Sequence, residues 1–202
     1  MQYHHLEFME FARTVIDALD AAEIDYLIGG AVAVWAYGEL RTTRDLDVVV
    51  NLPGTRIVQL FEELKKRKML VPAEIIIDLL IQPEGDLPIN AIHLDTGYKA
   101  EIFLLRDGDV YRNMSLNRRR QVDFGPPLGN VYVHSPEDLI LNKIHYFGLS
   151  QQAKHVNDIA SIMVLADDQL DVGYINQWVE RLNLSDTWIE MQERIHDVID
   201  SL

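Results

Sequence analysis

The sequence predicts a mixed α/β (α+β) fold, in which a small mixed β-sheet flanked by helices is followed by a C-terminal helical bundle. Short β-branched runs alternate with helical patterns up to residue 134, and only helical patterns follow Ser135. An apolar fraction of 48% over 202 residues suffices for a packed core, in one domain or two small ones. We expect an α/β domain over residues 1–134 and a helical domain over 135–202.

The first part of the α/β domain shows clear periodicities. Apolar residues from Phe8 to Leu19 recur at helical spacing, which predicts an amphipathic helix. Thr55 is placed to cap a later helix that turns Ile57, Val58, Leu60, Phe61 and Leu64 inward. The expected elements are a helix over 5–22, a strand over 26–28, a helix over 31–37 ending at Gly38, a strand over 46–51 and the helix after Thr55.

The second part is expected to contain a β-hairpin. Asp95-Thr96-Gly97 favours a tight reversal between strands at 91–94 and 99–105. The apolar run at 72–81 fits either a helix or a buried strand, and Pro72 favours a helix. Further expected elements are a helix over 109–119 and short strands at 121–122 and 131–133.

The helical domain begins with a strong start signal. Ser135 is a capping residue, Pro136 occupies the first helical position, and acidic residues follow in the first turn. The expected helices cover 136–147, 151–166, 172–182 and 186–200, with Ser185 capping the last.

Composition excludes several classes of function. The absence of cysteine rules out disulfides, thiolate metal sites and a cysteine nucleophile. A formal net charge of -14 disfavours broad attraction to nucleic acid or anionic membranes. There is no secretory signal pattern and no apolar run of the ~20 residues that cross a bilayer. We therefore expect a soluble, cytoplasmic protein with no membrane partner.

The most informative stretch joins a glycine pair to a pair of aspartates. Gly29-Gly30 ends an apolar strand, and a glycine turn lets the backbone approach an anionic ligand. Asp45 and Asp47 are two apart on a strand, so their carboxylates share a face and suit a pair of Mg²⁺ ions. Each feature has an ordinary alternative, because glycine pairs occur in plain turns and aspartates at solvated strand ends.

Two further residues bear on this stretch. Glu101 shares a strand face with apolar residues, and a carboxylate there needs a metal or a basic partner. Arg44 either contacts a phosphate or pairs with Asp45 or another acid. Neither a Gly-x-Ser-x-Gly elbow nor a P-loop pattern occurs in the sequence.

The order of apolar residue, Gly29-Gly30, a short helix and Asp45-Leu46-Asp47 resembles the nucleotidyltransferase superfamily, which shares the DNA polymerase beta fold. The resemblance implies that Asp45 and Asp47 bind two Mg²⁺ ions, with Glu101 as the third acid, and that the glycine turn holds the triphosphate. The family more often has Asp where this chain has Glu101.

The resemblance extends into the helical domain. The Asp-x4-Lys spacing of Asp138 and Lys143 and the helix over 154–162 are similar to the AbiEii-type nucleotidyltransferase toxins. This implies that Lys143 approaches the nucleotide phosphates and that Asp138 positions the acceptor or Lys143. From spacing alone, both residues could instead flank the buried stripe of a helix.

These features predict a Mg²⁺-dependent nucleotidyltransferase that transfers a nucleoside monophosphate from an NTP to a hydroxyl acceptor. The family includes enzymes that act on tRNA, proteins and small molecules, and its toxin branch acts beside an antitoxin protein. The acidic balance favours a small-molecule or protein acceptor, whereas the toxin-like motif favours tRNA. The alternative is a catalytically impaired nucleotide-binding or protein-interaction module, with Glu101 as its mark.

Overall fold

The computed structural model describes residues 2–72, 87–106, 108–166 and 169–200, with side chains from residue 7 onward. The predicted segment at 72–81 lies outside the described residues apart from Pro72. By its contacts the chain separates into two compact units. The first comprises Met1–Val32 with Thr42–Val133, and the second comprises Ala33–Arg41 with His134–Leu202.

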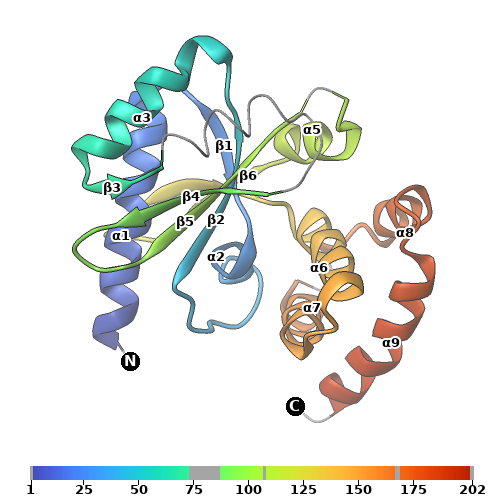
Figure 1. Cartoon of the computed structure of the whole chain (residues 1–202). Coiled ribbons are helices and arrows are strands. Elements are labelled where there is room, and N and C mark those ends of the chain that lie inside the picture. The colour runs from blue at the N-terminus through green and yellow to red at the C-terminus, as the bar shows by residue number, and fades with distance from the viewer. Residues whose placement is uncertain (1, 73–86, 107, 167–168, 201–202) are drawn as a thin grey trace. The chain divides into compact units, whose positions relative to one another are not determined.

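The described residues of the first unit form a seven-stranded mixed sheet with the order β3-β4-β5-β2-β1-β7-β6 (Figure 1). β1 runs parallel to β7 and β2 runs parallel to β5, whereas the other neighbours are antiparallel. The predicted mixed sheet and the β4–β5 hairpin are therefore confirmed. The strands are β1 (Asp25–Ile28), β2 (Asp45–Asn51), β3 (Met69–Leu70), β4 (Ile89–His93), β5 (Lys99–Leu104), β6 (Arg120–Asp123) and β7 (Asn130–Val133).

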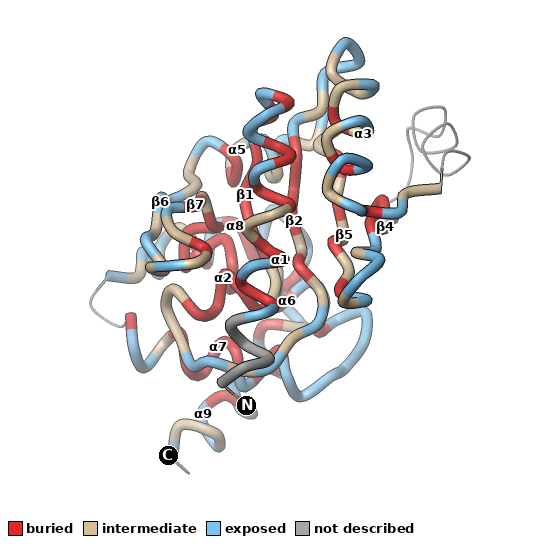
Figure 2. Tube along the Cα trace, turned by 90° about the vertical axis from the view of Figure 1, so that its left-hand side faces the viewer, coloured by how far each residue is buried: buried red, intermediate tan, exposed pale blue. Residues whose placement is uncertain are grey.

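Helices cover both faces of this sheet. α1 (Gln2–Ala21) and α3 (Ile57–Lys66) pack together on one face, where the Phe11 ring of α1 contacts the His93 ring of β4 (Figure 1). α5 (Val110–Asn117) lies on the other face, where its Leu116 joins a buried cluster with Leu27 and Val49. Figure 2 shows β1 and β2 as mostly buried strands between these layers.

Two predicted helices differ in detail from the structure. α2 (Gly30–Val34) ends three residues earlier than expected, and a turn leads on to Gly38. α3 follows a 3-10 turn at Gly54–Arg56, so Arg56 rather than Thr55 is its N-cap residue. Val58 is 74% exposed and does not face inward, because the turn of α3 buries only Leu60 and Leu64.

The described part of the second unit is a bundle of four longer helices. The segment Ala33–Arg41 belongs to the same unit. The backbone N–H of Asp138 donates to Ser135 Oγ over 3.2 Å, which confirms the predicted cap. A Cβ on Gly38 would lie 2.5 Å from Ser161 Oγ, so this segment packs tightly on α7. The helices are α6 (Pro136–Ser150), α7 (Ala153–Leu165), α8 (Val172–Arg181) and α9 (Ser185–Asp200).

Among the described residues, no helix is both long and apolar enough to span a bilayer.

Candidate active site

The Gly29–Gly30 turn is packed directly against Asp47. The backbone N–H of Gly29 donates to the carbonyl oxygen of Asp47 over 2.9 Å, which extends the β1–β2 ladder by one bond. Gly30 has a φ of +57°, and a Cβ there would lie 1.7 Å from Asp47 Oδ2. Glycine is therefore required at position 30 both for the left-handed backbone and for the carboxylate that lies over its Cα.

This arrangement changes which part of the turn is available to an anion. Sequence reasoning left the N–H groups of both glycines open to a ligand, but Gly29 uses its N–H in the sheet ladder. With five residues, α2 is also too short to contribute a large helix dipole. The predicted contact of the glycine turn with an anion stays a prediction.

β2 and β5 place the three predicted acidic residues on one face of the sheet. The parallel register pairs Asp45 with Lys99 and Asp47 with Glu101. Residues two apart on a strand share a face, and register partners on neighbouring strands do so as well. The four side chains, three acidic and one basic, therefore lie next to one another on one face of the sheet, two on each strand.

The same sheet face becomes apolar further along the two strands. Val49 follows Asp47 on β2, Phe103 follows Glu101 on β5, and Leu116 of α5 packs in the same cluster. α5 therefore covers the apolar end of the face. The carboxylates occupy the other end, where they are only partly buried.

Lys99 supplies the positive charge among these carboxylates. Its Nζ donates to Glu101 Oε1 over 2.5 Å and lies 3.5 Å from Asp45 Oδ1. The hydrogen bond to Glu101 is the main reason why the pKa of Lys99 is raised. Lys99 is therefore protonated at neutral pH and acts as the counter-ion of this end of the sheet.

Asn90 on β4 adds a neutral oxygen beside the acidic side chains of β2 and β5. It is the register partner of Glu101 on β4, and its buried Oδ1 has no hydrogen-bond partner among the residues that the structure describes. Buried polar atoms rarely stay unsatisfied, so an orphaned acceptor beside a carboxylate fits a bound cation or donor.

The donor chemistry of this face suits a hard divalent cation, although its side chains now surround an ammonium ion. Within the described residues there is no group of three or more His, Asp and Glu side chains that could hold a metal ion as arranged. Asp45 and Glu101 nevertheless both lie within 3.5 Å of one nitrogen, that of Lys99. Carboxylate oxygens are the ligands that Mg²⁺ prefers, so the residue types and their common face fit the metal.

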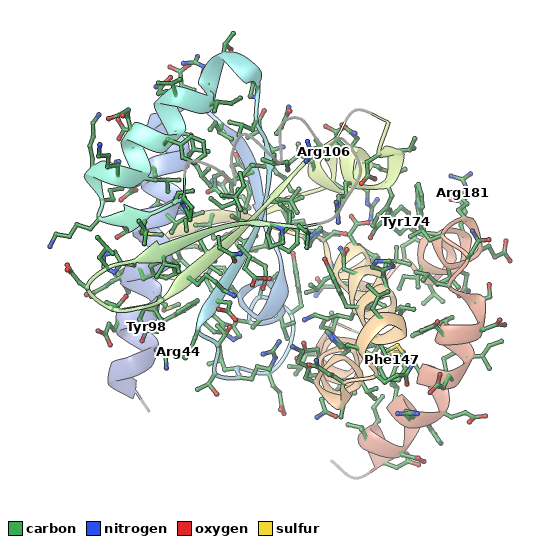
Figure 3. All side chains as sticks on the ribbon, viewed as in Figure 1. Arg44, Tyr98, Arg106, Phe147, Tyr174 and Arg181 are labelled. Atoms are coloured by element: carbon green, nitrogen blue, oxygen red, sulfur yellow. The ribbon has the colours of Figure 1, made fainter. Side chains whose placement is uncertain are left out.

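Arg44 lies beside this face but is directed at an aromatic ring. Its guanidinium lies over the ring of Tyr98, 5.9 Å from the centroid (Figure 3). In the described part of the chain Arg44 forms no ion pair with Asp45, and its side chain is exposed. Its predicted contact with a phosphate stays a prediction.

Lys143 belongs to the second unit, where it pairs with Asp158. Lys143 Nζ lies 2.6 Å from Asp158 Oδ2, and both side chains are almost fully buried. Arg41 donates to the two oxygens of Asp158 over 2.8 and 3.2 Å. Burial alone would raise the pKa of Asp158, but the hydrogen bonds and charges of Arg41 and Lys143 outweigh it and lower that pKa.

Asp138 is held by hydroxyl groups inside the second unit. Its carboxylate accepts from Ser135 Oγ over 2.9 Å and from the Tyr174 hydroxyl over 2.6 Å (Figure 3). Its exposure is 0%. These contacts tie the start of α6 to α8, and a role of Asp138 toward an acceptor stays a prediction.

His155 is a buried base beside the Lys143–Asp158 pair. Burial, followed by the charges of Lys143 and Lys154, lowers its pKa to about 4. Its ring stacks on that of Tyr146, and no described residue forms a hydrogen bond with its Nδ1. His155 is therefore neutral at pH 7.

Sequence reasoning missed Lys99 and Arg41 as members of these charge networks. Lys99 had a local signal, because it lies two residues before Glu101 on a strand and must share its face. Arg41 had none, because 117 residues separate it from Asp158.

Comparison with known proteins gives similarity in structure only. No protein-family model matches the sequence, and a search of curated protein sequences found no significant match. The solution structure of the antibiotic-resistance factor ANT(2'')-Ia has a TM-score of 0.58 at 16% identity, covering 98% of this chain and 100% of that chain. The crystal structure of ANT(2'')-Ia in complex with adenylyl-2''-tobramycin has a TM-score of 0.55 at 15% identity, covering 92% and 97%.

A third similar structure is that of a nucleotidyltransferase-like protein. An antigenic nucleotidyltransferase-like protein from Paracoccidioides brasiliensis has a TM-score of 0.53 at 18% identity, covering 90% of this chain and 92% of that chain. The chain thus has the fold of known nucleotidyltransferases, which confirms the predicted fold class. The resemblance to the AbiEii-type branch stays a prediction.

Proposed function

We propose that this chain is a metal-dependent nucleotidyltransferase that transfers a nucleoside monophosphate from an NTP to a hydroxyl group of an acceptor. One observation carries the proposal. The glycine turn lies against the Asp47 carboxylate, on the sheet face that also carries Asp45 and Glu101. The fold in which this occurs is that of known nucleotidyltransferases.

Each residue has a role that its chemistry supports. Asp45, Asp47 and Glu101 would hold two Mg²⁺ ions, which would neutralise the charge of the triphosphate and polarise its α-phosphorus. The glycine turn is the proposed contact of the triphosphate, and the absence of a side chain at Gly30 is what lets the Asp47 carboxylate lie over its Cα. Arg44 and Lys143 are the proposed cationic partners of the phosphates, and Asp138 is the proposed positioning residue.

In the proposed transfer step, one bond to the α-phosphorus forms, another breaks, and a carboxylate of the chain takes up the released proton. The acceptor oxygen bonds to the α-phosphorus, the bond from that phosphorus to the bridging oxygen breaks, and pyrophosphate leaves with the electron pair. One of the site carboxylates accepts the proton of the acceptor hydroxyl.

A small-molecule acceptor is the version that the chain supports best. ANT(2'')-Ia, whose structure holds adenylyl-2''-tobramycin, is matched over 97% of its chain by 92% of this one. A formal net charge of -14 also favours a cationic small acceptor over a polyanion such as tRNA. A tRNA or protein acceptor, and the role of a toxin with an antitoxin partner, rest only on the Asp138–Lys143 motif.

A second candidate is a module that binds nucleotides without transferring them. The ammonium of Lys99 between Asp45 and Glu101 favours it, because a permanent ion pair there would keep metal ions out. On this alternative, nucleotides bind without Mg²⁺.

The test is transfer of label from NTPs carrying ³²P at the α-phosphate. The protein is incubated with Mg²⁺, each of the four NTPs, and in turn an aminoglycoside, bulk tRNA and a protein mixture as acceptors. We expect pyrophosphate release and labelled product with one acceptor class. Asp47→Asn should lower the rate at least ~100-fold, since it removes a proposed ligand of the Mg²⁺ ions that stabilise the transition state.

The matched control is Asp17→Asn. Asp17 is 52% exposed on α1, where it pairs with Arg13, so its amide should leave the rate unchanged. Transfer that survives Asp47→Asn as well as Asp17→Asn would contradict the proposal. Nucleotide binding without transfer and without need of Mg²⁺ would establish the second candidate.

A further inference from the structure

The ammonium of Lys99 takes up space that the carboxylate site needs for a metal ion. Nζ lies 2.5 Å from Glu101 Oε1 and 3.5 Å from Asp45 Oδ1, so it bridges two of the three acids. A cation that binds those two oxygens meets an ammonium ion already there. The two cations repel each other and compete for the same lone pairs.

The position of Lys99 follows from the sheet register. Lys99 is the partner of Asp45 across the β2–β5 ladder and lies two residues before Glu101 on β5. Both neighbours therefore share its face, one across the ladder and one along the strand. The extra methylene of Glu101, compared with Asp, brings its carboxylate within reach of Nζ.

Lys99 is held loosely enough to leave. Its side chain is 31% exposed, and those of Asp45 and Glu101 are 49% and 24% exposed. Partly exposed ion pairs are weak, because water and salt screen them. A flexible four-carbon stem also allows the ammonium to move without any change in the backbone.

We propose that Lys99 is the resident cation of this site, which neutralises Asp45 and Glu101 in the metal-free protein and is displaced when a divalent cation binds. Lys99 thereby sets the concentration of metal at which the site fills. This inference rests on the proposed function, because it requires that the carboxylate site bind a divalent metal. The proposal also explains how Glu101 can serve as the third acid in place of Asp, because the longer side chain of Glu101 holds the Lys99 ammonium.

The test is direct binding of Mn²⁺ in the absence of nucleotide, followed by electron paramagnetic resonance. Lys99→Met keeps most of the stem and removes the charge, so the dissociation constant of Mn²⁺ should fall about tenfold. Lys99→Arg keeps the charge and should stay within about twofold of the natural protein. Asp47→Asn removes a ligand and identifies the site that is being measured.

Thermal unfolding supplies a second readout that separates displacement from a structural role. Without Lys99, three carboxylates repel one another, so Lys99→Met should lower the Tm of the metal-free protein and widen the upward shift caused by Mn²⁺. If Lys99 is purely structural, Lys99→Met also lowers that Tm, but the acids move apart. The variant then binds Mn²⁺ no better than the natural protein, and the upward shift of Tm with Mn²⁺ is not widened.

The outcomes are distinguishable. Mn²⁺ binding that is lost in Asp47→Asn but unchanged or weakened in Lys99→Met overturns the role of Lys99 and leaves the proposed function standing. A natural protein that binds no Mn²⁺, or that binds it equally well as Asp47→Asn, overturns both. Tighter binding in Lys99→Met, with Lys99→Arg unchanged, is the result that the inference predicts.

Discussion

Asp47 holds its carboxylate over the Cα of Gly30, so closely that a Cβ there would lie 1.7 Å from Oδ2. The backbone is tied at the same place, because Gly29 N–H donates to Asp47 O. One aspartate thus joins the glycine turn to the acidic strand both by its main chain and by its side chain. This contact makes a single site of two motifs that are 17 residues apart between Gly30 and Asp47.

Gly30→Ala should damage both stability and the site. The new methyl group collides with the Asp47 carboxylate, and the backbone at φ +57° strains any L side chain. We expect a loss of about 2–4 kcal/mol in the free energy of unfolding, measured with urea. Mn²⁺ affinity should fall as well, because Asp47 must move.

Gly54→Ala is the control for that substitution. A Cβ on Gly54 meets nothing within 4 Å, and its φ is not in the left-handed region. Its effect should stay within about 0.5 kcal/mol, with Mn²⁺ affinity unchanged. Equal behaviour of the two alanine variants would contradict the close approach of Gly30 and Asp47.

Asp158→Asn should destabilise the second unit. Without the carboxylate, Lys143, whose side chain is only 6% exposed, loses its ion pair with Asp158, and Arg41 loses its bidentate partner. Removing one partner of such a buried pair costs about 3–5 kcal/mol, and Lys143→Met in the same chain should restore part of it. The control is Glu190→Gln, which breaks an exposed i,i+4 pair worth less than about 1 kcal/mol.

Acid should reveal the same carboxylate. Because the pKa of Asp158 is lowered in the folded protein, its stabilisation is present above its ordinary pKa and is lost as the pH falls through the lower, folded value. The acid-induced loss of stability in the natural protein should therefore exceed that in Asp158→Asn. Identical acid unfolding curves would show that Asp158 carries no favourable charge interaction.

His155 should make stability fall between pH 6.5 and about 4, the ordinary and the folded values of its pKa. In that window the unfolded chain binds a proton that the folded chain does not, so stability rises with pH. Urea unfolding at pH 7.5, 6 and 5 should show a smaller slope for His155→Gln than for the natural protein. His196→Gln is the control, since the side chain of His196 is 76% exposed. An NMR titration that gives His155 a pKa near 6.5 would contradict the effect of its burial on that pKa.

Tyr174→Phe should loosen the contact between α6 and α8. It removes a 2.6 Å hydrogen bond to the fully buried Asp138 carboxylate, at an expected cost of about 1–3 kcal/mol. A double-mutant cycle with Asp138→Asn should show strong coupling, because the two groups share this bond. If Asp138→Asn instead abolished transfer with stability intact, Asp138 would act on a substrate.

Local patterns predicted most of the elements. The periodicity from Phe8 to Leu19, the hairpin around Gly97 and the Ser135 cap depend on neighbours in sequence, and each is confirmed. The end of α2 was not predictable, because Trp35 continues the helical pattern while its indole N–H donates to Arg41 O in the following loop.

Only those parts of the site that follow from the alternation of side chains along a strand could be predicted. Asp45 and Asp47 share a face by their spacing, and Glu101 lies on the strand beside them. The pairing of Asp158 with Lys143 and Arg41 depends on how separate segments pack, so no spacing rule reveals it. The direct approach of Asp47 to Gly30 likewise arises from the tertiary fold.

The affinity of the protein for each NTP, measured by isothermal titration calorimetry with and without Mg²⁺, tests most directly whether the carboxylates of β2 hold metal and nucleotide together. We expect binding that requires Mg²⁺ and that weakens at least ~10-fold in Asp45→Asn and Asp47→Asn but not in Asp17→Asn. Equal, Mg²⁺-independent affinity in all four proteins would show that the carboxylates of β2 are not a metal–nucleotide site.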